Sequence, residues 1–275
     1  MDAANDDRPF GPGESAVPEP LYRDYERLLR QVCSLPELPM MAAMVERRVL
    51  ARSPAEQAWY VDQILRGALW GQSGGGEAAL AMVCWVLRMR RDEAYEQLKV
   101  MYLAAHDAGR EAVVSMFRNI PPHKALAGGQ QLPEVRLPKD SEVTLGERRA
   151  MAAGREYQLL KRLLMDPDPL VIRKLLRNRQ LRLADIKVIA TRRPTVPEIL
   201  WEIAMHPRWF RREEVREALV RNPYGETGMA LTLLPSLGIR TLRRIAHSGD
   251  LHEEVQKSAA RLVTLREERT APWRV

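Results

Sequence analysis

The stretch LLMDPDPLVIRKLLRN, residues 163–178, indicates how the second half of this chain is built. It places Asp166 and Asp168 beside prolines, continues with an apolar and basic run, and closes on Asn178. An aspartate followed by a proline is typical of a helix start, because its carboxylate accepts from backbone N–H groups that lack a partner within the helix. An asparagine tolerates the left-handed conformation that ends many helices. The stretch therefore predicts one short helix with a marked start and a marked end.

Asp166 and Asp168 could also be the paired carboxylates of a hydrolase. Such a pair flanks a cleft, and the surroundings of the two groups push their pKa values apart. Here both acids stand in a proline-rich turn at the positive end of a helix dipole, where a carboxylate is favoured for structural reasons. Helix capping is therefore the preferred interpretation, and we predict no catalytic residue.

The pattern of this stretch returns 44 residues later. VIRKLLRN (171–178) aligns with VREALVRN (215–222), and both copies end on Arg-Asn. LWEIAMHP (200–207) aligns with LRRIAHSG (242–249) at an offset of 42 residues. An internal period of this size indicates stacked helical repeats, in which each unit buries its apolar face against its neighbours.

These units resemble the leucine-rich-repeat variant and HEAT-like class of helical repeats, which run as DPxxxVRxxxAxNPxxPxxxLxxLAxD. DPDPLVIRKLLRN, PEILWEIAMHP and EEVREALVRNP carry the resemblance, which covers about residues 157–262. His206 and His247 replace the second aspartate of the family pattern, and insertions break the period. The resemblance implies a right-handed α-solenoid that presents an interaction surface, and it implies no reaction.

The composition predicts an all-α protein, because Leu, Ala, Arg and Met are frequent while aromatic residues make up only 6% of the chain. Residues 1–20 are acidic and rich in proline and glycine, and we expect a disordered tail. Apolar residues at helical spacing predict a small N-terminal helical bundle over 21–120. We predict that residues 121–143 form a linker and that residues 144–275 form the HEAT-like helical repeat domain.

Four further features of the sequence limit the classes of protein to which this chain can belong. The longest apolar run, AALAMVCWVL at 78–87, is too short to cross a bilayer, so we expect no transmembrane segment and a cytoplasmic protein. Cys33 and Cys84 stand in apolar helical runs and are expected to be buried thiols. The glycine-rich GQSGGGE at 71–77 precedes no Lys-Ser or Lys-Thr pair, which excludes an ordinary phosphate-binding P-loop. The histidines show no metal-ligand spacing, so we expect no metal and no cofactor.

The basic residues of the second half are the best candidates for function. Residues 144–275 carry 26 Lys and Arg against 16 Asp and Glu, whereas the rest of the chain carries 17 against 20. Equivalent positions of stacked repeats fall on one face, so a basic ridge is predicted. The candidate partner-binding residues are Arg173, Lys174, Arg177, Arg179, Arg182, Arg192, Arg193, Arg208, Arg211, Arg212, Arg221 and Arg244.

A basic ridge suits an acidic protein segment, the phosphates of a nucleic acid or an anionic membrane surface, and it can also be a solvated surface without a partner. We interpret the chain as a non-enzymatic scaffold or regulatory adaptor of a bacterial cytoplasm that binds a protein partner. Nucleic-acid binding by the basic ridge is the alternative. The opposite charges of the two halves also predict a salt-sensitive contact between them. The sequence leaves the identity of the partner and the oligomeric state open.

Overall fold

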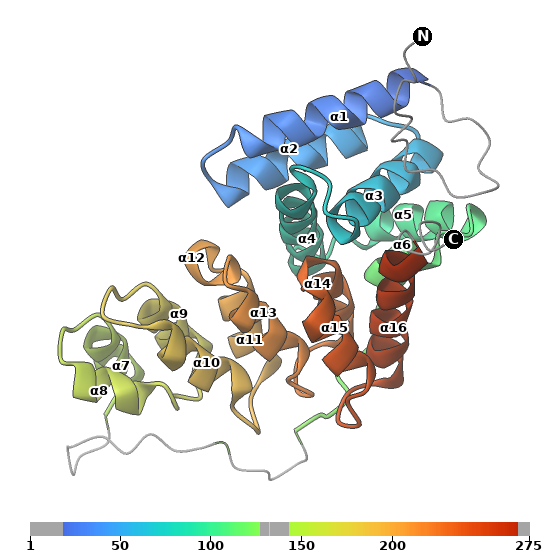
Figure 1. Ribbon diagram of the computed structural model, residues 1–275. Helices are drawn as coiled ribbons and strands as arrows, with labels where there is room; N and C mark the ends of the chain where they lie inside the picture. The colour runs from blue at the N-terminus through green and yellow to red at the C-terminus, as the bar shows by residue number, and fades with distance from the viewer. Residues whose placement is uncertain (1–18, 127–131, 133–142, 269–275) are drawn as a thin grey trace.

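The computed structural model describes residues 19–126, 132 and 143–268, and every secondary-structure element within them is helical (Figure 1). The predicted all-α class is therefore confirmed. Most of the predicted tail (1–20) and linker (121–143) lies outside the described residues. Within the described part, no helix combines the length and the apolar character needed to cross a bilayer.

The helices of the first half pack around α4. They are α1 (Glu19–Cys33), α2 (Leu38–Leu50), α3 (Pro54–Leu69), α4 (Gly75–Arg91), α5 (Tyr95–Asp107) and α6 (Glu111–Phe117). α4 contacts α2 and α3 most extensively, and its residues Met82, Trp85 and Leu87 are fully buried. The apolar run at 78–87 is therefore the core helix of this half.

The two cysteines are free thiols in different surroundings. Cys84 is half-buried in α4, whereas Cys33 is exposed as the last residue of α1. The expectation that both thiols are buried is wrong for Cys33, because the buried stripe of α1 ends at Val32 and the next position turns toward solvent.

The second half is a row of short helices that ends in one longer helix (Figure 1). They are α7 (Leu145–Ala152), α8 (Tyr157–Leu163), α9 (Pro169–Leu176), α10 (Leu183–Thr191), α11 (Pro197–Ala204), α12 (Pro207–Phe210), α13 (Glu213–Val220), α14 (Thr227–Leu233), the 3₁₀ turn η1 (Leu234–Ser236), α15 (Ile239–Ala246) and α16 (Glu253–Glu268). α9 packs on α7 and α11, and α13 packs on α10 and α14. Each short helix thus buries its apolar stripe against helices of neighbouring units.

The aspartates of the opening stretch both have structural roles. Asp168 is the N-cap of α9, and its Oδ1 accepts from the N–H groups of Leu170 at 2.7 Å and Val171 at 3.3 Å. Asp166 is fully buried in the preceding turn, where its Oδ1 accepts from the N–H of Asp168 at 2.9 Å. Its Oδ2 lies 2.9 Å from Nε of Arg148 in α7. Asp166 therefore fastens the turn to α7 and does not cap a helix.

Asn178 joins the end of α9 to the end of α7. Its Nδ2 donates to the carbonyl oxygens of Ala152 at 2.9 Å and Gly154 at 2.8 Å, and its Oδ1 accepts from the N–H of Gln180 at 2.9 Å. The expectation of a left-handed asparagine is wrong, because Glu93 is the one non-glycine residue with positive φ in the described part. The side chain of Asn178, and not its backbone, does the capping.

Asn222 repeats this arrangement at the matched position. Its Nδ2 donates to the carbonyl oxygens of Ala190 at 2.8 Å and Arg192 at 3.0 Å, and its Oδ1 accepts from the N–H of Tyr224 at 3.1 Å. The 44-residue sequence match thus corresponds to one hydrogen-bond pattern that is used twice.

The two halves meet along α3, α4 and α6, which contact α14, η1 and α16. Buried apolar residues of both halves belong to one core, and several polar bonds also cross the junction. Arg90 of α4 donates from Nε to Oγ1 of Thr232 at 2.8 Å, Arg118 pairs with Glu254, and Nε1 of Trp70 donates to the carbonyl of Leu265 at 3.0 Å. A contact between the halves was expected from their charges, and apolar packing dominates it.

The Asn222→Ala variant should lower the free energy of unfolding by about 2 kcal/mol, because two buried carbonyl groups lose their donor. Urea unfolding monitored by circular dichroism measures the change. Asn178→Ala is the matched variant and should cost less, because Asn178 is only partly buried while Asn222 is 3% exposed. Unchanged stability of Asn222→Ala would contradict the role assigned to these side chains.

Candidate functional site

The structure divides the twelve candidate cations by what their side chains contact. Seven pair with a carboxylate or donate to a backbone carbonyl of the protein: Arg173, Arg192, Arg193, Arg208, Arg211, Arg221 and Arg244. The other five form no ion pair with a described residue: Lys174, Arg177, Arg179, Arg182 and Arg212. The predicted ridge is therefore not uniformly available to a partner.

Arg192 is the clearest correction. Its side chain is buried, and Nη1 donates to the carbonyl oxygens of Leu164 at 3.3 Å and Asp166 at 2.9 Å. Its Nη2 donates to Oγ1 of Thr195 at 3.3 Å. Burial lowers the pKa of Arg192. The prediction that Arg192 faces a partner is wrong, since its guanidinium holds the turn before α9 in place.

Arg173 is tied to Glu202 of α11 by two short hydrogen bonds, from Nε at 2.7 Å and from Nη2 at 2.6 Å. Arg91 of α4 donates to the same carboxylate at 3.0 Å. Burial by itself would raise the pKa of Glu202, but the hydrogen bonds and charges of Arg173 and Arg91 outweigh it and lower that pKa. Arg173 therefore helps to join the two halves.

Arg221 and Arg244 lie together and share one acid. Both guanidinium groups contact Oε1 of Glu217, at 3.2 Å from Nε of Arg221 and 3.0 Å from Nη2 of Arg244. Nη2 of Arg193 donates to the backbone carbonyl of Arg221 at 2.6 Å. The cations in this part of the ridge are therefore already engaged by other groups of the protein.

Three of these five cations, Lys174, Arg177 and Arg179, line one pocket at the ends of α7 and α9. This basic pocket has a volume of about 370 Å³, and Asn178 forms part of its wall. It is lined by four cations, Arg155, Lys174, Arg177 and Arg179, and by no acidic residue. None of the four pairs with an acid of the described residues. Four unneutralised cations around one cavity raise the local concentration of anions.

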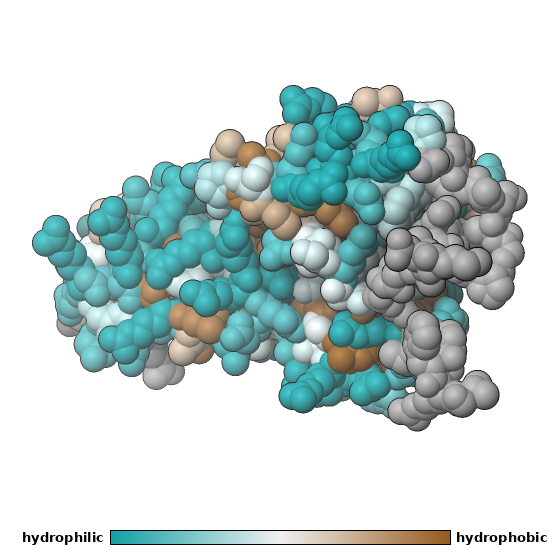
Figure 2. All heavy atoms as spheres, turned by 45° about the horizontal axis from the view of Figure 1, so that its top comes forward, coloured by the Kyte–Doolittle hydropathy of each residue, from teal (hydrophilic) through white to brown (hydrophobic). Residues whose placement is uncertain are grey.

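The positive field extends from the basic pocket to α12. Burial, together with the charges of Arg177 and Arg208, lowers the pKa of His206. The Arg208 guanidinium stacks on the ring of Trp209 at 4.1 Å. Figure 2 shows that hydrophilic residues dominate the visible surface over the end of the molecule built by α7–α10. The predicted cations Arg182 and Arg212 are also exposed in this half.

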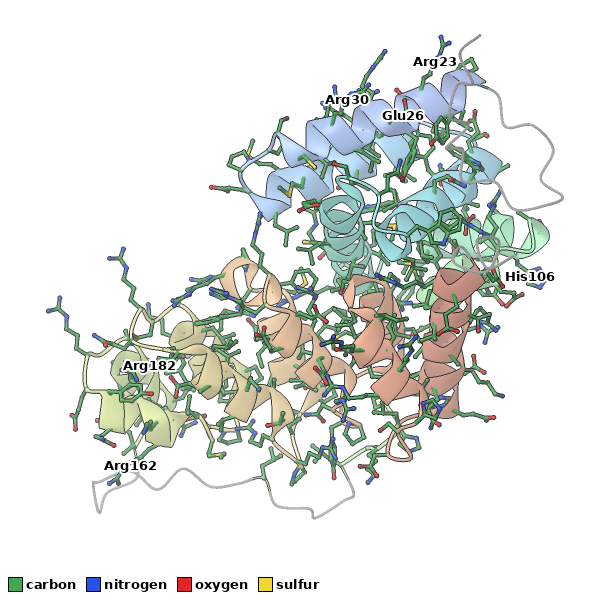
Figure 3. All side chains as sticks on the ribbon, viewed as in Figure 1. Arg23, Glu26, Arg30, His106, Arg162 and Arg182 are labelled. Atoms are coloured by element: carbon green, nitrogen blue, oxygen red, sulfur yellow. The ribbon has the colours of Figure 1, made fainter. Side chains whose placement is uncertain are left out.

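Arg182 stands just before α10 (Figure 3), and its guanidinium lies over the aromatic ring of Tyr157. Its guanidinium is 5.3 Å from the ring centre of Tyr157, and Nζ of Lys161 is 5.1 Å from the same centre. The Tyr157 hydroxyl donates to the carboxylate of Asp185, at 3.0 Å and 3.2 Å from its two oxygens. Arg182 thus has an aromatic contact while keeping its charge unpaired.

The matched turn in the next unit explains why the basic pocket is distinctive. Asn178 donates to the carbonyl of the residue before Arg155, and Asn222 donates to the carbonyl of the residue before Arg193. Arg155 therefore corresponds to Arg193, and Arg177 corresponds to Arg221. In that next unit Arg193 donates to the carbonyl of Arg221 and lies 3.9 Å from Asp250, and Arg221 pairs with Glu217. The same backbone arrangement therefore carries paired cations in one unit and unpaired cations in the other.

Sequence reasoning missed Arg155, which lies outside the aligned segments. Two signals could have located the pocket. Aligning MAAGR (151–155) with IATRR (189–193) places Arg155 on Arg193. Aligning the two copies position by position places Arg173 where the second copy has Glu217, so the first copy lacks the acid that would neutralise Arg177.

The comparisons with known proteins give no match: no family model, no curated protein and no solved structure matches this chain. Among the described residues, no group of three or more histidine, cysteine or acidic side chains is placed to hold a metal ion.

Glu202 should contribute to stability at neutral pH and lose that contribution in acid. Its pKa in the folded protein is below the ordinary value of 4.5, so its contribution is present above pH 4.5 and disappears as the pH falls through the folded-state pKa. Glu202→Gln should reduce stability at pH 7 by about 1 kcal/mol, with a smaller difference from the native protein near pH 3. Thermal unfolding across this range measures both effects.

Glu198, one turn earlier on α11, provides the control. It is exposed and forms no ion pair with a described residue, so Glu198→Gln should leave the pH dependence unchanged. The same response in both variants would show that the bridge to Arg173 and Arg91 does not stabilise the junction.

Proposed function

We propose that this chain is a non-enzymatic scaffold or regulatory adaptor that holds an acidic segment of a protein partner in the basic pocket. The observation that carries the proposal is the set of four cations, Arg155, Lys174, Arg177 and Arg179, that line one cavity without an acidic neighbour. Arginine presents a fork of N–H donors that matches a carboxylate, and lysine adds a mobile charge. This combination suits a run of glutamate or aspartate side chains.

The repeated asparagine bonds support a HEAT-like, right-handed α-solenoid as the architecture of the second half. Asn178 and Asn222 fasten successive units by the same three hydrogen bonds, which suits a stack of similar units. Such a stack keeps the turns between helices at fixed spacing. A partner would therefore meet a rigid surface, as a scaffold requires, and we retain the cytoplasmic location expected from the sequence.

A protein partner fits the charge distribution better than a nucleic acid. A surface that follows a phosphate backbone needs unpaired cations at successive positions along its path. Here Arg221 and Arg244 of the next unit pair with Glu217, and Arg173 is held by Glu202. The positive charge is therefore local, which suits a short acidic segment of a folded or extended protein.

A double variant tests the proposal. Lys174→Glu with Arg177→Glu should weaken binding of a fluorescein-labelled decaglutamate peptide by tenfold or more, because each cation lost removes a charge-assisted contact worth about 1.5 kcal/mol. Fluorescence anisotropy at low and at physiological salt measures the affinity. Both positions are exposed and unpaired within the described residues, so circular dichroism should show an intact fold.

The control carries the same change of net charge at a distance from the pocket. Arg30→Glu with Arg240→Glu alters exposed residues of α1 and α15, and Figure 3 shows Arg30 pointing away from the molecule. This variant should bind the peptide as the native protein does. Equal weakening in both double variants would overturn the proposal. Binding of mixed-sequence single-stranded DNA with a steep salt dependence, and no binding of the peptide, would favour the nucleic-acid alternative.

A further inference from the structure

A second cavity lies at the junction of the two halves, away from the basic pocket. This junction pocket has a volume of about 440 Å³ and is formed by the end of α4, by α5, by the residues after α6 and by Glu226 before α14. Its size is typical of sites for small molecules, which combine apolar walls with a few polar groups. A larger and more polar cleft adjoins it and shares Arg90, Tyr95 and Glu226.

Arg90 is the fixed polar group of the junction pocket. Arg90 is 9% exposed, and its Nε donates to Oγ1 of Thr232 at 2.8 Å. Its Nη2 donates to the carbonyl oxygens of Met116 at 2.7 Å and Arg118 at 2.9 Å. Nη1 has no hydrogen-bond partner among the described residues. One nitrogen of a firmly held guanidinium is thus left for a ligand.

Gly228 makes this position of Arg90 possible. A β-carbon at residue 228 would lie 2.7 Å from Nη1 of Arg90 and 3.1 Å from the carbonyl oxygen of Arg118. A larger side chain there would displace the guanidinium. The backbone of α14 is therefore shaped around a buried cation, whose pKa is lowered to about 10 by burial.

The walls of the junction pocket are aromatic. Tyr95, Tyr102 and Phe117 line it, and Tyr95 is 53% exposed although it stands at the start of α5 beside the cavity. Aromatic rings offer flat apolar surfaces that stack on other rings or meet them edge-on. The body of a ligand in this site would be flat and apolar.

The charges of the junction pocket favour a single negative charge on the ligand. Arg90 and Lys99 contribute two positive charges, while Glu226 contributes one negative charge and accepts a hydrogen bond from Nε1 of Trp201 at 2.9 Å. The lining residue Arg118 is already paired with Glu254. One positive charge is left over, which balances a carboxylate better than a phosphate dianion.

We propose that the junction pocket binds a small aromatic carboxylic acid. Its ring lies among Tyr95, Tyr102 and Phe117, and its carboxylate accepts from Nη1 of Arg90 and from Lys99. Glu226 of the second half also lines the pocket, so a bound ligand lies at the junction of the two halves. Such a ligand raises the free energy of unfolding according to its concentration and affinity.

Three closely related probes test the chemistry of the ligand. 3-Phenylpropionate should raise the unfolding temperature in a concentration-dependent way and should give a saturable signal in calorimetric titration. 3-Phenylpropionamide lacks the charge, and 3-cyclohexylpropionate lacks the aromatic ring, so each should bind about tenfold more weakly. Absence of binding by 3-phenylpropionate at millimolar concentration, or equal binding of the amide, would overturn the proposal.

Variants of exposed residues separate the site from general effects. Lys99→Ala and Tyr95→Ala should each weaken 3-phenylpropionate binding several-fold, and neither removes a described hydrogen bond of the side chain. Lys187→Ala, an exposed change on α10, is the control and should bind as the native protein does. The Lys174→Glu, Arg177→Glu protein should also bind normally, which keeps this result independent of the proposed function. Unchanged affinity in both Lys99→Ala and Tyr95→Ala would place the probe elsewhere and contradict the assignment.

Discussion

Every helix ends with carbonyl groups that have no donor within the helix, and short helices have a large share of such groups. The helices from α7 to α15 have nine residues or fewer, so the second half depends on side chains that supply the missing donors. Asn178 and Asn222 do so between units, and Trp209 donates to the carbonyl of Leu176 at 2.9 Å. Buried arginines serve the same need: Arg216 donates to the carbonyl of Phe210 at 2.7 Å. Much of the arginine content is thus a structural requirement of short helices.

This requirement explains how far the sequence could predict the structure. Helix propensity and the cap at Asp168 involve only residues that are close in sequence. The all-α class and the start of α9 could therefore be predicted from the sequence. The partner of an arginine depends on which helix end lies next to it. Arg192 and Arg177 look alike in the sequence, yet one is buried against two carbonyls and the other lines a pocket. The role of Asn178 was missed for the same reason, because its acceptors are 24 and 26 residues away.

The candidate sites lie at different places in the row of helices. The basic pocket belongs to the end formed by α7 and α9, whereas the junction pocket lies where α4 and α5 approach the start of α14. The units between them are fastened to each other by side-chain donors such as Asn222 and Trp209. Neither pocket includes an acid and base pair in the arrangement that hydrolysis would use, and Asp166 and Asp168 are occupied in the turn before α9.

The bond between Trp70 and Leu265 joins residues that are 195 positions apart, and α16 packs on α3 and α6 near the end of the described chain. During synthesis, the helices of the first half leave the ribosome long before the helix that covers them. Their apolar junction surface therefore stays partly uncovered until α16 has been made, which lengthens the period in which it can associate with other chains. Closing so long a loop also slows the final docking step, because distant contacts form only after the entropy of closure has been overcome.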